Sequence, residues 1–476
     1  MSFTPIKFGT DGWRAIIAEE YTFENVRAAA QGVASYLLSQ GNFERGLVVG
    51  YDTRFASEEF AAAVAEVVCA NGIPVALCDR ACPTPTVSYN VLDRQAAGAV
   101  IITASHNSSR WNGFKYKPDY AGSASPVVVA ELEKRIEEAQ RTGTIQRMNI
   151  SDAESSGRLH RFDPTVAYLK QITTLVDLDA IRASSLNIAI DSMHGAAAGY
   201  LAGLLSGGTA TVTELHSARN PAFPDMDQPE PIAHNLTSLS SHIRSSGADV
   251  GLATDGDADR LGLMDERGVF VTQLQALALL ALYFLEVRGE RGAMVKSITT
   301  TNMLYRLGDQ YDVPVFETPV GFKHIGPIMT REHAMLGGEE SGGYGFRGHI
   351  PERDGILSAL YILSMMVKLK KRPSELIEYL YRKVGPHHYD RIDITFDPAV
   401  RQAVIDRLQA AEPTRLGGSP VANVDTMDGF RYRLENGSWS LIRFSGTEPL
   451  LRIYCETSSP DRVRELLAET RQLTGV

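Results

Sequence analysis

The sequence has few cysteines and no long apolar run. Its four cysteines form neither a CxxC pair nor a spacing typical of a disulfide framework. The most apolar stretch, Leu274 to Leu285, is shorter than the ~20 residues of a membrane-spanning helix, so it predicts a buried helix instead. No positively charged and then apolar leader opens the chain, so no export signal is visible. We therefore expect a cytoplasmic protein without a membrane segment.

Positive charge is not in excess either. The chain has 57 Asp and Glu against 47 Lys and Arg, a net charge of −10, which argues against a nucleic-acid partner. An anionic ligand would therefore have to be met by positive charge gathered locally. The length of 476 residues predicts three or four domains, at roughly 150 residues per domain.

Three successive segments show the same order of strand, helix, strand, helix and strand. The third strand of each is apolar and runs into a polar loop; these strands are expected at 97–102, 249–253 and 334–336. Open α/β sheets bind ligands beyond the carboxyl ends of their strands, so the three loops can meet at a central cleft. The sequence thus predicts three similar α/β domains with mixed sheets, at residues 1–150, 158–265 and 268–385.

The last segment has a different pattern. Strands are expected at 391–396, 429–435, 439–444 and 451–456, with an Asn436-Gly437 hairpin turn and a closing helix from Pro460. This order predicts an α+β domain at residues 390–476. Earlier in the chain, the stretch Pro83 to Thr86 is typical of a turn.

The first of the three loops carries a serine. The stretch Thr103 to Lys115 reads TASHNSSRWNGFK, in which Ser105 follows the apolar strand and His106 follows the serine. Because a serine at this place is presented to the ligand site, we expect Ser105 to carry a phosphoryl group. The absence of a Gly-x-Ser-x-Gly elbow argues against a serine hydrolase. Lys115 could exchange protons if the site lowered its pKa.

The second loop carries three carboxylates at alternate positions, Asp255, Asp257 and Asp259. On one side of an extended segment they would repel one another without a cation, and hard oxygen ligands suit Mg²⁺. An EF-hand is excluded because Arg260 stands where its sharp turn needs glycine. A dehalogenase-type phosphatase also has Asp-x-Asp after a strand, but one aspartate would be its nucleophile and the serine loop would have no role.

Two further loops suit a sugar phosphate. In the third repeated loop, Glu339 and Ser341 lie between glycines and offer acceptors and a donor to sugar hydroxyls. In the last segment, Arg443 to Pro449 reads RFSGTEP, where an arginine fork, two hydroxyls and backbone N–H groups can cradle a phosphate. Arg452 on the following strand adds positive charge.

These four motifs together resemble those of the α-D-phosphohexomutase family, over nearly the whole chain. TASHN…NGFK, DGDADR, GEESGG and RFSGTEP occur in that family's order and spacing. The resemblance implies three α/β domains and a C-terminal domain related to the TATA-box-binding fold, around a central cleft. It also implies a sugar-phosphate substrate, and we expect a monomer or a weak homodimer.

When the family's functional residues are assigned motif by motif, the resemblance implies that Ser105 is the phosphoserine. It also implies that Mg²⁺ is bound by the phosphate on this serine and by the three aspartates. Arg260 and Lys115 would assist phosphoryl transfer, Lys115 as a general acid or base, and His106 joins this catalytic group. The substrate-binding residues would be Arg14, Lys296, Lys323, Glu339, Ser341, Arg443, Ser445, Gly446, Thr447 and Arg452.

The sequence departs from the family pattern at two places. Ser108 stands where proline is common, and Gly343 stands where mannose- and glucosamine-type members usually have histidine, which removes a possible acid/base. The Glu-Glu-Ser loop and Gly321-Phe322-Lys323 look more like glucose-specific phosphoglucomutases. The expected reaction interconverts glucose 1-phosphate and glucose 6-phosphate, with glucose 1,6-bisphosphate as intermediate and activator. A dual glucose/mannose enzyme, a phosphoglucosamine mutase and a non-catalytic sugar-phosphate binder are the alternatives.

Overall fold

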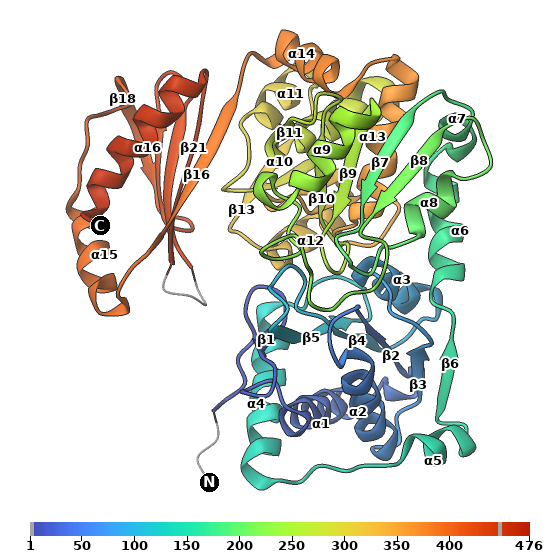
Figure 1. Ribbon diagram of the computed structural model, residues 1–476. Coiled ribbons are helices and arrows are strands. Elements are labelled where there is room, and N and C mark those ends of the chain that lie inside the picture. Colours follow the sequence, from blue (N-terminus) through green and yellow to red (C-terminus); the bar gives the residue numbers. More distant parts are fainter. Residues whose placement is uncertain (1–3, 446–449) are drawn as a thin grey trace.

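Four β-sheets divide the chain into four domains (Figure 1). The structure is a computed structural model that describes residues 4–445 and 450–476. The first three sheets are mixed and lie among helices, whereas the fourth is antiparallel throughout. This architecture confirms the predicted fold class of three α/β domains followed by an α+β domain.

The first domain has a six-stranded sheet. Its strands are β1 (Trp13–Ile16), β2 (Leu47–Tyr51), β3 (Val75–Cys78), β4 (Gly98–Ile102), β5 (Trp111–Pro118) and β6 (Leu159–Phe162), in the order β1-β5-β4-β2-β3-β6. Its helices are α1 (Phe23–Gln40), α2 (Ser57–Ala70), α3 (Thr84–Asp93), α4 (Pro126–Thr142) and α5 (Ile150–Ser155). The helix α1 begins where the Thr22 side chain accepts a hydrogen bond from the Asn25 amide, and it ends at Gly41, whose φ is +74°.

The second domain has five strands. They are β7 (Asn187–Asp191), β8 (Thr211–Leu215), β9 (Val250–Thr254), β10 (Leu261–Met264) and β11 (Phe270–Val271), in the order β11-β10-β9-β7-β8. Its helices are α6 (Thr165–Leu175), α7 (Leu178–Arg182), α8 (Tyr200–Leu205) and α9 (Thr237–Ser246).

The third domain has four strands. They are β12 (Met294–Ser297), β13 (Val315–Thr318), β14 (Leu336–Gly338) and β15 (Tyr344–Phe346), in the order β13-β12-β14-β15. Its helices are α10 (Gln273–Leu282), α11 (Met303–Tyr311), α12 (Phe322–Arg331), α13 (Gly355–Leu369) and α14 (Pro373–Val384). The apolar run at 274–285 forms α10 and the start of a π-helical turn, and it is buried as predicted.

The three α/β domains repeat one strand arrangement. In each sheet the first strand (β2, β7, β12) runs parallel to the second and third strands, and the third strand (β4, β9, β14) pairs antiparallel with the strand that follows it. The connections after the third strands carry Ser105, the aspartate triplet and Glu339 respectively. The three loops are therefore structurally equivalent.

The fourth domain stands to one side of the other three (Figure 1). Its strands are β16 (His388–Thr395), β17 (Arg415–Leu416), β18 (Ser419–Asp425), β19 (Phe430–Leu434), β20 (Trp439–Phe444) and β21 (Leu450–Thr457), and its helices are α15 (Arg401–Ala410) and α16 (Pro460–Thr474). Alternate residues of its strands face opposite sides: Ile442 and Ile453 pack with the two helices, whereas Leu441 and Tyr454 pack against Ile298 of the third domain.

Some details differ from those expected from the sequence. The strand β6 pairs with β3, so the first sheet continues to Phe162 although the second domain was expected from residue 158. The strand β11 likewise extends the second sheet to Val271. The stretch Pro83 to Thr86 is not an isolated turn, because α3 begins at Thr84. Pro85 fits the first turn of this helix, since the backbone N–H groups of a first turn have no hydrogen-bond acceptor within the helix.

Hydrophobic packing joins the second and third domains. One continuous cluster runs from Tyr168 to Val384 and includes the buried faces of α10 and α13, whereas the first and fourth domains have clusters of their own. Among the described residues, no helix has the length and apolar character needed to cross a membrane.

Candidate active site

Ser105 lies against the aspartate loop of the neighbouring domain. Its side chain is fully buried, and its Oγ donates a hydrogen bond to Oδ2 of Asp255 at 2.8 Å. Nδ1 of His106 lies 3.3 Å from the same Oγ. The backbone of Ser105 has a φ of +52°, which is uncommon for a residue with a side chain, and its amide donates to Oγ1 of Thr103. The loop therefore holds this hydroxyl in one defined place.

The three aspartates form a buried carboxylate cluster. One oxygen from each of Asp255, Asp257 and Asp259 lies within 4.8 Å of the others. Burial and the neighbouring Asp257 and Asp259 raise the pKa of Asp255 well above its usual range. The Oδ1 atoms of Asp257 and Asp259 are buried without a hydrogen-bond partner. Hard oxygen donors with unsatisfied lone pairs are what a divalent cation needs, so these residues fit a metal ion.

Lys115 lies inside the same cluster. Its Nζ lies 2.8 Å from Oδ2 of Asp257, 3.2 Å from Oδ2 of Asp259 and 2.8 Å from Oδ2 of Asp11. Burial opposes its charge, but the three carboxylates outweigh burial and raise the pKa of Lys115. These carboxylates therefore favour the ammonium form of Lys115.

Arg260, Arg14 and His106 border the serine and the carboxylates. Nη1 of Arg260 lies 2.9 Å from Glu230, and its Nε lies 3.9 Å from Asp255. Nη1 of Arg14 donates to Oδ1 of Asn107 in the serine loop at 2.7 Å. Burial, with the positive charges of Arg260 and Arg14, lowers the pKa of His106 well below its usual range, so this imidazole is neutral.

Glu339 reaches the cluster through an arginine. Its Oε2 lies 3.6 Å from Nη1 of Arg353, and Nη2 of that arginine lies 2.9 Å from Oδ2 of Asp259. Ser341 is half-buried two residues further along the same loop. All three repeated loops therefore come together, as the sequence predicts.

Other predicted substrate-binding residues make ion pairs within their own domain, the third or the fourth. Lys296 pairs with Glu317 at 2.8 Å, Arg443 with Asp428 at 3.0 Å and Arg452 with Asp393 at 3.4 Å. Lys323 is half-buried at the start of α12. Within residues 4–445 and 450–476, no hydrogen bond or ion pair joins these four residues to Ser105 or to the aspartates.

The phosphate-cradle motif is only partly described. Ser445 is buried, and its amide donates to the carbonyl of Leu450 at 2.8 Å. Gly446 and Thr447 lie outside the described residues. The charge of Arg452 still contributes to lowering the pKa of His106, so the fourth domain presents positive charge towards the serine loop.

Arg54 is a site residue that none of the sequence motifs includes. Its guanidinium is fully buried and donates to four carbonyls of the serine loop, those of Ser105 (2.6 Å), Asn107 (2.5 Å), Ser108 (2.8 Å) and Trp111 (3.1 Å). Its Nε pairs with Asp52 at 3.1 Å. Arg54 therefore shapes the backbone on which Ser105 sits. The only sequence signal is an Asp-x-Arg at the end of β2.

We expect Arg54→Lys to destabilise the fold by about 3 kcal/mol, because the single ammonium group of lysine cannot replace a guanidinium that donates hydrogen bonds to four buried carbonyls. Chemical denaturation measures this loss. Arg45→Lys is the matched control, since Arg45 also bonds two carbonyls, those of Gln95 and Ala96, but is exposed. Its expected cost is under about 1 kcal/mol. Equal losses in the two variants would contradict the role given to Arg54.

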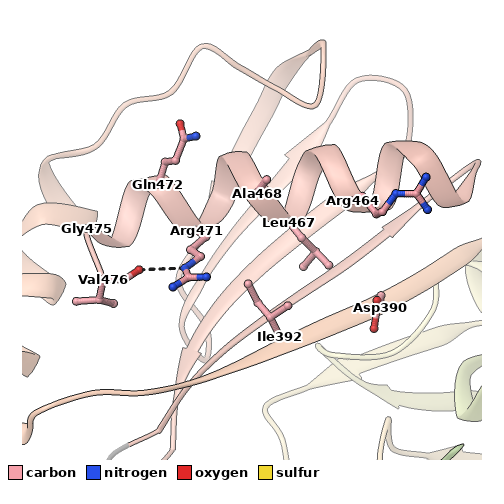
Figure 2. A pocket seen from close by; sticks show the side chains of 9 residues that line it. All are labelled: Asp390, Ile392, Arg464, Leu467, Ala468, Arg471, Gln472, Gly475 and Val476. Carbon is pink, nitrogen blue, oxygen red and sulfur yellow. Dashed lines mark hydrogen bonds between the residues drawn. The ribbon is translucent and has the colours of Figure 1, made fainter.

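A groove in the fourth domain lies away from these loops (Figure 2). It has a volume of about 670 Å³ and lies between β16 and α16 in the fourth domain. Ile392 and Leu467 line it, with Arg464 and Arg471 on the helix side. None of the predicted site residues lines this groove.

Four family models match the chain in succession. They describe phosphoglucomutase/phosphomannomutase α/β/α domain I at residues 5–142, domain II at 166–268, domain III at 274–384 and the C-terminal domain at 399–473. The chain belongs to the phosphoglucomutase/phosphomannomutase family of the α-D-phosphohexomutase superfamily. It is accordingly a mutase, an enzyme of the isomerase class, and its family implies a sugar-phosphate substrate.

Individual relatives carry different sugar names. A phosphoglucomutase/phosphomannomutase from Thermococcus kodakarensis is 31% identical over 461 residues, which cover 97% of this chain and 96% of that protein. A protein from Methanothermobacter thermautotrophicus described as a phosphoglucosamine mutase is 30% identical, with coverage of 98% and 97%. A crystal structure from Thermus thermophilus, described as a phosphomannomutase, has a TM-score of 0.86 and 34% identity, covering 99% of this chain and 100% of that one. These relatives do not distinguish among hexose phosphates.

Proposed function

We propose that this enzyme interconverts glucose 1-phosphate and glucose 6-phosphate through a phosphoserine at position 105. The 2.8 Å contact between Oγ of Ser105 and Asp255 carries the proposal, because it brings a buried hydroxyl to a cluster of carboxylates, Lys115 and Arg260. Phosphomonoesters are very slow to react unaided. Their transfer therefore needs positioning and charge neutralisation, and this cluster offers both.

We propose Mg²⁺ as the cofactor. Asp255, Asp257 and Asp259, together with the phosphate on Ser105, would hold it, in keeping with the unsatisfied carboxylate oxygens. When bound, it would neutralise negative charge on the phosphoryl group.

The protein residues then have the following proposed roles. The bond between phosphorus and Oγ of Ser105 breaks, a bond forms to the free hydroxyl oxygen of the sugar, and glucose 1,6-bisphosphate results. The proton lost by the sugar hydroxyl is finally taken up at Oγ of Ser105, and Nδ1 of the neutral His106, 3.3 Å from that oxygen, would orient the hydroxyl through a hydrogen bond. Lys115 and Arg260 offset the charge of the transferring group. The bisphosphate reorients, and its other phosphate returns to Ser105.

The remaining contacts would orient the substrate. Glu339 and Ser341 would bind sugar hydroxyls, and Arg14, Lys296 and Lys323 would add basic groups around the cleft. The non-reacting phosphate would be bound by Arg443, Ser445, Gly446, Thr447 and Arg452. Because both phosphates must occupy this place in turn, the cradle should recognise phosphate rather than the sugar.

A comparison of three substrates tests the choice of sugar. Initial rates are measured on the 1-phosphates of glucose, mannose and glucosamine, with Mg²⁺ and a trace of glucose 1,6-bisphosphate. We expect the highest kcat/KM on glucose 1-phosphate, in line with the Glu-Glu-Ser loop. A higher value on mannose or glucosamine phosphate would favour the dual enzyme or the phosphoglucosamine mutase, both of which agree with the names of the relatives. Peptide mass analysis should find the phosphate on Ser105.

A further inference from the structure

Gly343, at the end of the sugar loop, has no room for a side chain. A Cβ built on it would lie 2.3 Å from Cδ and 2.7 Å from Cγ of Arg353, distances that real Cβ atoms do not show. Its φ lies outside the left-handed region, so the backbone itself would accept any residue. Gly342 differs, because its φ is +89°. Position 343 therefore requires glycine because the side chain of Arg353 occupies the space that a Cβ would need.

Arg353 cannot easily move out of that space. The residue is 5% exposed, and its guanidinium contacts carboxylates from three domains. Nη2 lies 2.6 Å from Asp11 and 2.9 Å from Asp259, and Nε lies 3.1 Å from Glu352. A rotation of the Arg353 side chain that moved its aliphatic part away from Gly343 would also separate the guanidinium from these buried carboxylates. Separating a buried ion pair costs free energy.

The same guanidinium is the link between the sugar loop and the aspartate cluster. Its Nη1 lies 3.6 Å from Glu339, whereas its Nη2 contacts Asp259. The amide of Glu339 also donates to the carbonyl of Gly343 at 3.0 Å. The position of the Glu339 carboxylate relative to the reacting centre thus depends on a stem that passes directly over Gly343.

We propose that Gly343 and Arg353 act as a pair that sets the sugar preference of the site. Arg353 is a positioning residue: it fills the space above Gly343 and holds Glu339 at a fixed distance from the aspartates. A fixed acceptor distinguishes hexose phosphates that differ in one hydroxyl, because a wrongly placed hydroxyl leaves a buried polar group unpaired. This inference rests on the proposed function and on Glu339 binding sugar hydroxyls.

A double-mutant cycle tests the pair. Gly343→Ala should lower kcat/KM on the preferred sugar phosphate about tenfold or more and change the glucose-to-mannose ratio of kcat/KM by a similar factor, since it displaces the stem. In an Arg353→Ala background the same change should cost nothing further. The clashing Cγ and Cδ are then gone, and the remaining Cβ of residue 353 is 3.4 Å away. An equal loss in both backgrounds, or an unchanged ratio in Gly343→Ala, would overturn the proposal.

Controls separate this result from other failures. Gly203→Ala should leave the rates unchanged, because Gly203 lies in α8 with open space around its Cβ position. If Arg353→Ala does not fold, Arg353→Lys keeps the charge and most of the stem but not the fork, and it should still change the sugar ratio. An unchanged glucose-to-mannose ratio of kcat/KM in Arg353→Lys would also overturn the proposed role of the Gly343 and Arg353 pair. A wild-type enzyme that converts none of the hexose 1-phosphates would instead refute the proposed function.

Discussion

Ser105→Ala is expected to lower mutase turnover by about 10⁴-fold or more, because the variant cannot form the phosphoserine on which both half-reactions depend. The fold should survive. Alanine meets the same left-handed backbone that Ser105 already adopts, and the side-chain partners lost are Asp255 and His106. A coupled assay with added glucose 1,6-bisphosphate measures the rate, and thermal melting reports on the fold.

Ser108→Ala is the matched control in the same loop. Arg54 contacts only the backbone carbonyl of Ser108, which alanine retains, so this variant should keep near-normal turnover. Intact-protein mass analysis should find a phosphate in the wild type and in Ser108→Ala, and none at position 105 in Ser105→Ala. Normal mutase activity in Ser105→Ala, or phosphate trapped on Asp255, would contradict the phosphoserine and point to an aspartyl nucleophile.

The strands that lead into the three loops could be predicted from the sequence because they are short apolar runs. All residues of β4 and β9 are buried, and only a polar loop interrupts the run. The return strand β5 could not be predicted in the same way. It buries Asn112, Lys115 and Lys117, and the two lysines are paired with carboxylates from 104 (Lys115 to Asp11) to 235 residues away in sequence. A polar residue that is buried by a distant ion pair carries no local hydrophobic signal.

The same reason explains which site residues the sequence reveals. Ser105 and the aspartates stand out because unusual residue types follow a buried strand. Arg54 acts through backbone carbonyls of the serine loop, about 50 residues away in its own domain, and Arg353 acts through carboxylates of other domains. The importance of both residues therefore appears only in the folded structure. The lysine pKa depends on the same assembly. Lys115 has ordinary neighbours in sequence and three carboxylates around it in space.

Asp255→Asn is expected to have opposite effects on metal binding and on the stability of the metal-free protein. The amide keeps both hydrogen bonds of the carboxylate, since its oxygen can accept from the Arg260 amide and its NH₂ can donate to Oγ of Ser105. It removes one of three clustered charges. Metal affinity should therefore fall on the order of 100-fold, measured by titration calorimetry with Mg²⁺ or Mn²⁺, and turnover should fall with it.

Without metal, the variant should be the more stable protein at neutral pH. Burial, Asp257 and Asp259 hold the pKa of Asp255 well above its usual range, so ionising this group costs folding free energy. Its stabilising contribution is complete below the unfolded pKa and is lost as the pH rises through the folded pKa. Asparagine does not titrate, and the free energy of unfolding of the metal-free variant should rise by about 1 kcal/mol at pH 7.

Millimolar Mg²⁺ should raise the melting temperature of the wild type but not that of Asp255→Asn. Asp249→Asn, at the other end of β9, should respond to Mg²⁺ like the wild type, and equal responses in all three proteins would contradict a metal site at the aspartates.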